Sequence, residues 1–205
     1  MSRSVVCISR TIGAGGEEVA KLVAEELGFR YVDDEIVRRA AELAGVSPEQ
    51  VAQAEHSRPL VARIMEALAT VPVISEGVYV AAPVLSPNVS YSHLIDHVVR
   101  ETAEQKDVVI VAHGASHALG DRPDVLRVLV TASPQTRAAR LSRESGVDER
   151  IAAKSVDESD KERVRYLDRI YDVRHELPIH YDLTLNTDLV TPATASALVV
   201  AAARA

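Results

Sequence analysis

A glycine-rich stretch near the N-terminus, "SRTIGAGGEEV" at residues 9–19, contains the residue types needed to bind an anion. A β-branched run precedes it and a helical pattern follows it. Glycines let successive backbone N–H groups point into one concavity, and a helix that begins there adds its partial positive charge. The stretch therefore predicts a phosphate-binding loop formed by Gly13, Ala14, Gly15, Gly16 and Glu17.

Two side chains that usually complete such a loop are absent. Gly16 and Glu18 stand where a lysine and a Ser or Thr are expected. The lysine usually stabilises negative charge on the transferred phosphoryl group, and the hydroxyl helps to bind Mg²⁺. Arg10 carries a permanent charge on a fork suited to phosphate, so it either replaces the lysine or only caps the sheet edge. Glu18 either binds Mg²⁺, which prefers oxygen ligands, or only begins the helix.

Other charged residues follow predicted strands or share a helical face. Asp33 and Asp34 end a strand, where open α/β sheets present ligand-contacting groups, although the commoner role of such residues is a helix N-cap. Two sets of charged residues are spaced three positions apart on predicted helices, so each set can bind a ligand together or form an ordinary exposed row. These sets are Arg137 with Arg140, and Asp157 with Asp160 and Arg163.

The elements that must position these residues alternate along the chain. Helical patterns separate five strand-like runs, which predicts an α/β fold with a five-stranded parallel sheet flanked by helices. The runs are 5–9, 29–35, 107–115, 124–132 and 181–188. Helices are expected at about 35–43, from the "SPEQ" start at 47–50, through 60–68, near 92–105 and at 191–205. The apolar stretch 70–91 contains three prolines and a glycine, so it predicts strand pieces and loop that form a lobe or partner surface.

Composition narrows the class of protein. The 205 residues suit one domain, and a formal charge of -7 argues against a broad nucleic-acid surface. The single Cys7 excludes a disulfide within the chain. The first apolar run is too short for a signal peptide or a membrane span, so we expect a cytoplasmic protein that does not bind membranes. We also expect a monomer or a homodimer.

At this level of detail the chain resembles the cytidylate kinase-like family of P-loop nucleoside monophosphate kinases, in the branch whose lysine-free loop has the pattern S-R-x-x-G-x-G-G. The resemblance rests on "ISRTIGAGGEEVAKLVAEELGFRYVDDEIV" at 8–37 and continues at "VIVAHGASHAL", "LVTASPQTRAARL", "DESDKERVRYL" and "YDLTLNTD". It covers most of the chain, and residues 46–92 match poorly.

The resemblance implies a P-loop kinase fold with a helical lid at about 137–175 and an acceptor-binding insert at about 46–92, which transfers the γ-phosphoryl of ATP with Mg²⁺. It places Asp33, Arg39 and Asp157 at the acceptor, Arg137 and Arg140 at the ATP phosphates, and Asp160 and Arg163 beside the transferred group. His113, which stands where relatives show the arginine of Gly-Arg-Gly, is placed with the substrate-binding residues, and an acidic residue expected near the end of the third strand is missing. Two alternatives stay open: a nucleotide-binding module without turnover, and a kinase of a non-nucleotide acceptor.

Overall fold

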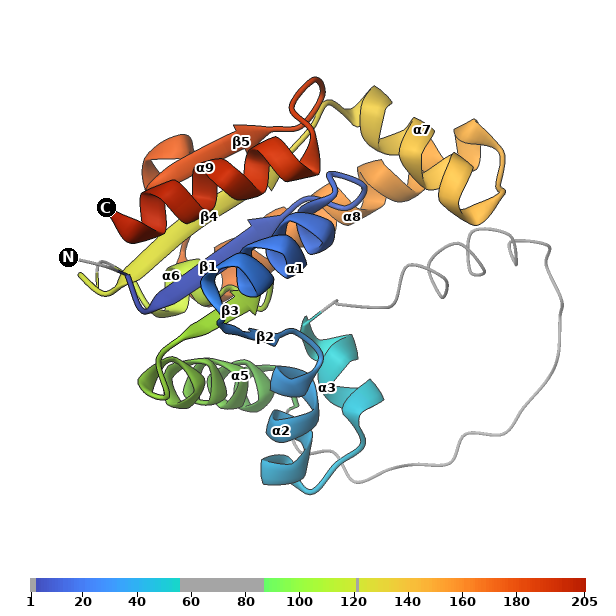
Figure 1. Cartoon of the computed structure of the whole chain (residues 1–205). Helices are drawn as coiled ribbons and strands as arrows, with labels where there is room; N and C mark the ends of the chain where they lie inside the picture. Colours follow the sequence, from blue (N-terminus) through green and yellow to red (C-terminus); the bar gives the residue numbers. More distant parts are fainter. Residues whose placement is uncertain (1–2, 56–86, 121) are drawn as a thin grey trace, which may run out of the picture.

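The computed structural model describes residues 3–55, 87–120 and 122–205, and Figure 1 shows the arrangement of their elements. Five parallel strands form one sheet: β1 (Val5–Arg10), β2 (Arg30–Val32), β3 (Val108–Val111), β4 (Val125–Thr131) and β5 (Leu183–Asn186). Their order is β2-β3-β1-β4-β5, and every neighbouring pair is parallel. The predicted five-stranded parallel sheet is therefore confirmed.

Strand β1 lies at the centre of the sheet because its side chains are apolar on both faces. Val5 pairs with Val108 of β3 and with Val125 of β4. Since side chains of a strand alternate between faces, Val5 and Cys7 enter one hydrophobic core while Val6 and Ile8 enter the other. Cys7 is thus a buried core residue, and burial raises the pKa of its thiol to about 12.

Helices cover both faces of the sheet. On one face, α1 (Gly16–Leu27) packs beside α9 (Pro192–Arg204), and Val19, Val23 and Val199 supply apolar contacts. On the other face lie α2 (Glu35–Ala44), α3 (Pro48–Glu55), α5 (Pro87–Glu104) and the short α6 (Ala115–Ala118), whose core includes Ile36 and Ile95. Both faces of β1 are consequently buried, as the continuous apolar run predicts.

Two further helices pack on each other beside the glycine-rich loop that follows β1. Helices α7 (Pro134–Ser145) and α8 (Glu149–Tyr171) pack on each other and share a small core of Ala138, Leu141, Ala152 and Val156. Ile12 of the glycine-rich loop packs against that core. A 3-10 turn, η1 (Pro178–His180), then leads into β5. Figure 1 shows α7 at one end of the molecule, in the region that the sequence predicts as a lid.

Helix starts agree with the sequence at some points and differ at one. Helix α3 begins at Pro48, and the Gln50 side chain accepts a hydrogen bond from the Ser47 N–H at 3.1 Å, as the "SPEQ" signature predicts. Helix α5 begins at Pro87, so the prediction of strand or loop at 87–91 is wrong. Proline suits the first helical position, where its missing N–H costs nothing. The helix expected through 60–68, and most of the 70–91 stretch, lie outside the described residues.

Candidate functional site

The loop between β1 and α1 has a backbone that only glycine accommodates easily. Gly13 and Gly15 have φ values of 75° and 76°, in the left-handed region. A Cβ atom on Gly13 would lie 2.8 Å from the Arg137 carbonyl oxygen, and one on Gly16 would lie 2.6 Å from the Arg10 Cβ. The first N–H groups of α1 have no partner within the helix and carry its partial positive charge. The loop thus has the tight glycine turn before a helix that the sequence indicates.

Arg10 ends β1 at the mouth of this loop. Its Nη2 atom forms an ion pair with Glu17 Oε1 at 2.6 Å, and 26% of its side chain is exposed. Its Nε atom is buried and has no hydrogen-bond partner among the described residues. An unsatisfied buried donor is costly, and a phosphate oxygen would satisfy it. The residues around the loop therefore fit a phosphate ligand. Glu18 is exposed in the first turn of α1.

Asp33, which follows β2, is held by a buried histidine that follows β3. The Nε2 atom of His113 lies 3.1 Å from the Asp33 carbonyl oxygen and 3.3 Å from its Oδ1, and Tyr31 donates to Oδ2 at 3.1 Å. Burial alone would raise the pKa of Asp33, but the hydrogen bond and charge of His113, together with the charge of Arg10, hold that pKa below its ordinary value. Asp33 is therefore an ionised carboxylate in the field of Arg10.

The backbone around His113 is strained. Ala112, His113 and Gly114 have successive φ values of 61°, 54° and 64°. Non-glycine residues in this region cost of the order of 1–3 kcal/mol and concentrate at functional sites. A Cβ on Gly114 would lie 2.6 Å from the Tyr171 ring, so the turn also needs glycine for space. In this structure the His113 imidazole contacts both the carbonyl oxygen and the carboxylate of Asp33.

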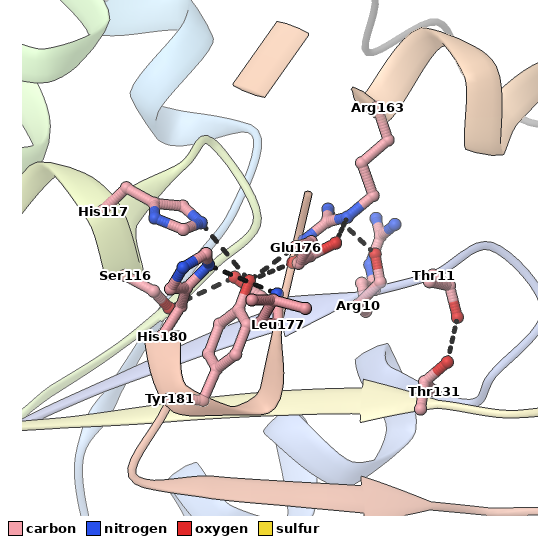
Figure 2. Close-up of polar contacts among 11 residues, drawn as sticks. Arg10, Thr11, Ser116, His117, Thr131, Arg163, Glu176, Leu177, His180 and Tyr181 are labelled. Atoms are coloured by element: carbon pink, nitrogen blue, oxygen red, sulfur yellow. Dashed lines mark hydrogen bonds and ion pairs between the residues drawn. The ribbon is translucent and has the colours of Figure 1, made fainter. Parts of the chain in front are cut away.

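Arg163 of α8 reaches the same edge of the sheet. Figure 2 shows its guanidinium between Glu176 and Arg10. Its Nε donates to Glu176 Oε2 at 2.7 Å and its Nη2 donates to Oε1 at 2.5 Å, while Nη1 donates to the Arg10 carbonyl oxygen at 3.3 Å. The sequence groups Asp157 and Asp160 with Arg163 on one helical face, but neither carboxylate pairs with it. Asp160 pairs with Arg137, and Asp157 pairs with Lys161.

A polar network lies behind Arg163. The Tyr181 hydroxyl donates to Glu176 and lies 3.4 Å from both Arg163 Nη2 and His117 Nε2. Burial raises the pKa of Glu176, but the Arg163 hydrogen bonds outweigh it and the net pKa is lowered. Burial and the Glu176 carboxylate raise the pKa of Tyr181, which stays a hydrogen-bond donor. The sequence alone does not single out Glu176, Tyr181 or His117 as site residues, because no motif spacing joins α6 to the segment between α8 and β5.

Arg137 and Arg140 lie against the loop but are engaged by the protein itself. Arg137 is buried; it donates to Asp160 Oδ1 at 2.8 Å and Oδ2 at 2.5 Å, and its Nε donates to the Ala132 carbonyl at 3.1 Å. Arg140 donates to the Thr187 hydroxyl at 2.9 Å and to its carbonyl at 2.6 Å. Thr187 in turn donates to the Ala14 carbonyl at 2.8 Å. These arginines brace the loop, and the "NTD" turn at 186–188 takes part in the bracing.

Two predicted site residues point elsewhere in this structure. Arg39 lines a groove between α2 and α5, and its nearest carboxylate, Glu101 Oε1, is 3.4 Å away. Asp157 forms an exposed ion pair with Lys161 at 2.6 Å. The structure thus gathers Arg10, Asp33 and Arg163 around the loop mouth and leaves Arg39 and Asp157 on the surface.

The described residues contain no group of three or more His, Cys, Asp or Glu side chains placed to hold a metal ion. A Mg²⁺ ion carried by nucleotide phosphates needs only one or two carboxylates from the protein. Within the same described ranges, no helix has the length and apolarity required to span a bilayer.

The parallel sheet, the glycine-rich loop at the end of β1 and the helices beyond it define a kinase-like enzyme with a P-loop fold. The chain belongs to the cytidylate kinase-like family, whose model matches residues 5–189. The resemblance drawn from the sequence motifs is therefore confirmed. Membership of the family supports a nucleotide kinase-like function and implies the use of ATP.

Curated relatives agree with this assignment. A cytidylate kinase from Ignicoccus hospitalis is 27% identical over 192 residues, covering 92% of each chain. One from Archaeoglobus fulgidus is 24% identical over 183 residues, covering 89% of this chain and 84% of the relative.

Solved structures share the fold at lower identity. A protein from Eubacterium ventriosum has a TM-score of 0.69 and 19% identity, with 98% of each chain covered. Shikimate kinase from Acinetobacter baumannii, in complex with shikimate, has a TM-score of 0.51 and 13% identity, with 97% of this chain and 91% of that chain covered.

Proposed function

We propose that the protein is an ATP-dependent phosphotransferase that moves the γ-phosphoryl group of ATP to a nucleoside monophosphate. The observation that carries this proposal is the set of groups where β1 ends and the glycine-rich loop begins. There a permanent cation, Arg10, with a buried and unpartnered Nε, lies beside the unsatisfied N–H groups at the start of α1. Both features are satisfied by phosphate oxygens, and the family relatives are named for nucleotide phosphorylation.

The proposed roles follow from position. The backbone from Gly13 to Glu17 binds the phosphates, and Arg10 supplies the cation that the missing lysine would otherwise supply. Arg163, whose Nη1 faces the loop mouth, stabilises charge that develops during transfer. Phosphoryl transfer needs little covalent help, so positioning and charge stabilisation supply most of the catalysis.

The ionised Asp33 is proposed to orient the acceptor, because it lies at the carboxyl end of β2 within the field of Arg10. Mg²⁺, when bound with the nucleotide, neutralises phosphate charge, and the exposed Glu18 carboxylate is the proposed protein ligand. Arg39 belongs to this acceptor site only if α2 or its side chain moves from the Glu101 contact.

A direct test is a coupled assay of ADP release over a panel of acceptors. The panel contains CMP, UMP, AMP, GMP, their deoxy forms and shikimate, each with ATP and Mg²⁺. We expect turnover with a nucleoside monophosphate, and we expect Arg10→Ala to abolish most of it. Arg38→Ala is the matched control, because Arg38 is exposed on α2 and pairs with Glu42 at 2.7 Å.

Two other functions are distinguished by the same panel. Tight ATP binding without ADP release for any acceptor would identify a binding module, which the missing loop lysine favours. Turnover with shikimate or another non-nucleotide alcohol would identify a different acceptor class, which the shared fold with shikimate kinase favours.

A further inference from the structure

We infer that Glu176, supported by Tyr181, is a positioning residue that fixes which edge of the Arg163 guanidinium faces the phosphate-binding loop. This inference rests on the proposed function, because it assigns Arg163 to the transferred phosphate. Glu176 lies in the segment between α8 and β5 and is thirteen positions from Arg163, so the contact is made by the fold and not by helix spacing.

One edge of the Arg163 guanidinium is occupied by Glu176. A guanidinium has five N–H donors in a fixed plane: one on Nε and two on each terminal nitrogen. Glu176 takes the Nε–Nη2 edge through two hydrogen bonds of 2.7 and 2.5 Å, and the Tyr181 hydroxyl lies 3.4 Å from Nη2. The donors on Nη1 are left on the side of the Arg10 carbonyl. An arginine held along one edge in this way presents the opposite nitrogen to the loop.

The ion pair of Arg163 and Glu176 is largely buried. Arg163 and Glu176 have only 22% and 15% of their side chains exposed, so water cannot easily replace either partner. Burial works against the charge of Arg163, but the Glu176 hydrogen bonds outweigh it and raise its pKa above the ordinary value. The carboxylate thus keeps a phosphate-binding cation in place without a ligand. Such preorganisation lowers the cost of ordering the long side chain during catalysis.

Glu176 is itself held by a hydrogen bond. Tyr181, two residues before β5, donates its hydroxyl hydrogen to Glu176. His117 of α6 packs on the Tyr181 ring with ring centroids 5.8 Å apart, and Figure 2 shows its imidazole next to the Tyr181 hydroxyl. The Tyr181 hydroxyl therefore fixes the same Glu176 oxygen, Oε1, that accepts from Arg163 Nη2. Three separate segments of the chain determine one arginine orientation.

The test compares Glu176→Gln, which keeps the shape but removes the charge, with Arg163→Ala and with the double variant. We expect Glu176→Gln to lower kcat by about tenfold or more while the KM for ATP changes by less than about threefold, because misplacing a catalytic group costs rate. In the double variant kcat should equal that of Arg163→Ala alone, since Glu176 acts through Arg163. Tyr181→Phe should give a smaller loss of the same kind, and Glu176→Asp should recover part of the rate.

Glu158→Gln is the matched control, because Glu158 forms an exposed ion pair with Lys154 on the same helix. Thermal unfolding of every variant separates loss of fold from loss of rate. An unchanged kcat for Glu176→Gln, or losses that add in the double variant, would overturn the inference. A gain in kcat or in ATP affinity would also overturn it, because Glu176 would then compete with phosphate for Arg163.

The same variants separate this inference from the proposed function. If the wild type releases no ADP with any acceptor, the proposed function fails, and calorimetric binding of a non-hydrolysable ATP analogue takes the place of kcat. Glu176→Gln and Arg163→Ala should then weaken analogue binding by the same factor, with no further loss in the double variant. Independent effects on binding would reject the positioning role even in that case.

Discussion

Arg137 and Asp160 form a bidentate ion pair that joins α7 to α8 next to the glycine-rich loop, with N···O distances of 2.8 and 2.5 Å. Only 4% of the Arg137 side chain is exposed, against 38% for Asp160. The same guanidinium also donates to the Ala132 carbonyl. A single buried side chain thus links the end of β4, the loop and the two helices that follow.

The first prediction concerns the stability that this link provides. Arg137→Ala leaves a carboxylate and a buried carbonyl without their donor, so the free energy of unfolding should fall by about 2–4 kcal/mol. Urea unfolding followed by circular dichroism measures it. Arg143→Ala, at an exposed position in the last turn of α7, should change the same quantity by less than about 0.5 kcal/mol. Equal stabilities for the two variants would contradict the bracing role.

A second prediction concerns Arg10 and nucleotide affinity. Arg10→Ala should weaken ATP binding by about 1–3 kcal/mol, the value of a hydrogen bond to a charged group. Isothermal calorimetry with a non-hydrolysable analogue gives this number directly, and Arg38→Ala serves as the control. An unchanged affinity in Arg10→Ala would mean that the arginine only pairs with Glu17 and closes the sheet edge.

Mg²⁺ dependence provides a third prediction. If Glu18 is a metal ligand, Glu18→Gln should raise the Mg²⁺ concentration for half-maximal nucleotide binding about fivefold, equivalent to roughly 1 kcal/mol. Glu25→Gln, exposed on the same helix, should leave it unchanged. A Mg²⁺ titration identical to that of the wild type would leave Glu18 as a residue that only complements the helix dipole.

The sequence predicts the frame of this site well because strong local patterns determine it. Continuous β-branched runs allow only buried strands, and glycines at 13, 15 and 16 allow only a tight turn before a helix, so the sheet and the loop follow from local rules. The start of α5 at Pro87 was missed because three prolines dominate the stretch, although proline is favourable in a first helical turn.

Side-chain partners could not be predicted in the same way. The spacing of Asp157, Asp160 and Arg163 places them near one helical face, yet they do not pair with one another. Asp157 pairs with Lys161 of the same helix, whereas Asp160 and Arg163 pair with residues of other segments. Glu176 lies outside the sequence motifs, Tyr181 lies at the start of the fifth strand-like run, and only tertiary packing brings both to Arg163. Sequence reasoning supplies the charges, whereas the tertiary fold decides how they pair.

The last prediction concerns His117 and acid stability. Its ring packs against Tyr171, His180 and Tyr181, with centroids 5.5, 5.9 and 5.8 Å away. Burial lowers the pKa of His117 to about 4; the nearby Glu176 raises it and Arg163 lowers it. The imidazole is therefore neutral in the folded protein at neutral pH, whereas an unfolded chain takes up the proton at a pKa of about 6.5.

Because the unfolded state binds this proton first, the free energy of unfolding should fall as the pH drops from about 6.5 to about 4, by on the order of 2–3 kcal/mol from this group. Below that range both states are protonated and the effect levels off. His117→Gln removes the titrating group, so its stability should vary less over this range, while exposed His175→Gln should follow the wild type. Urea unfolding at intervals of half a pH unit measures the difference. Equal slopes for the wild type and His117→Gln would show that folding does not lower the pKa of the His117 imidazole, which would contradict the prediction.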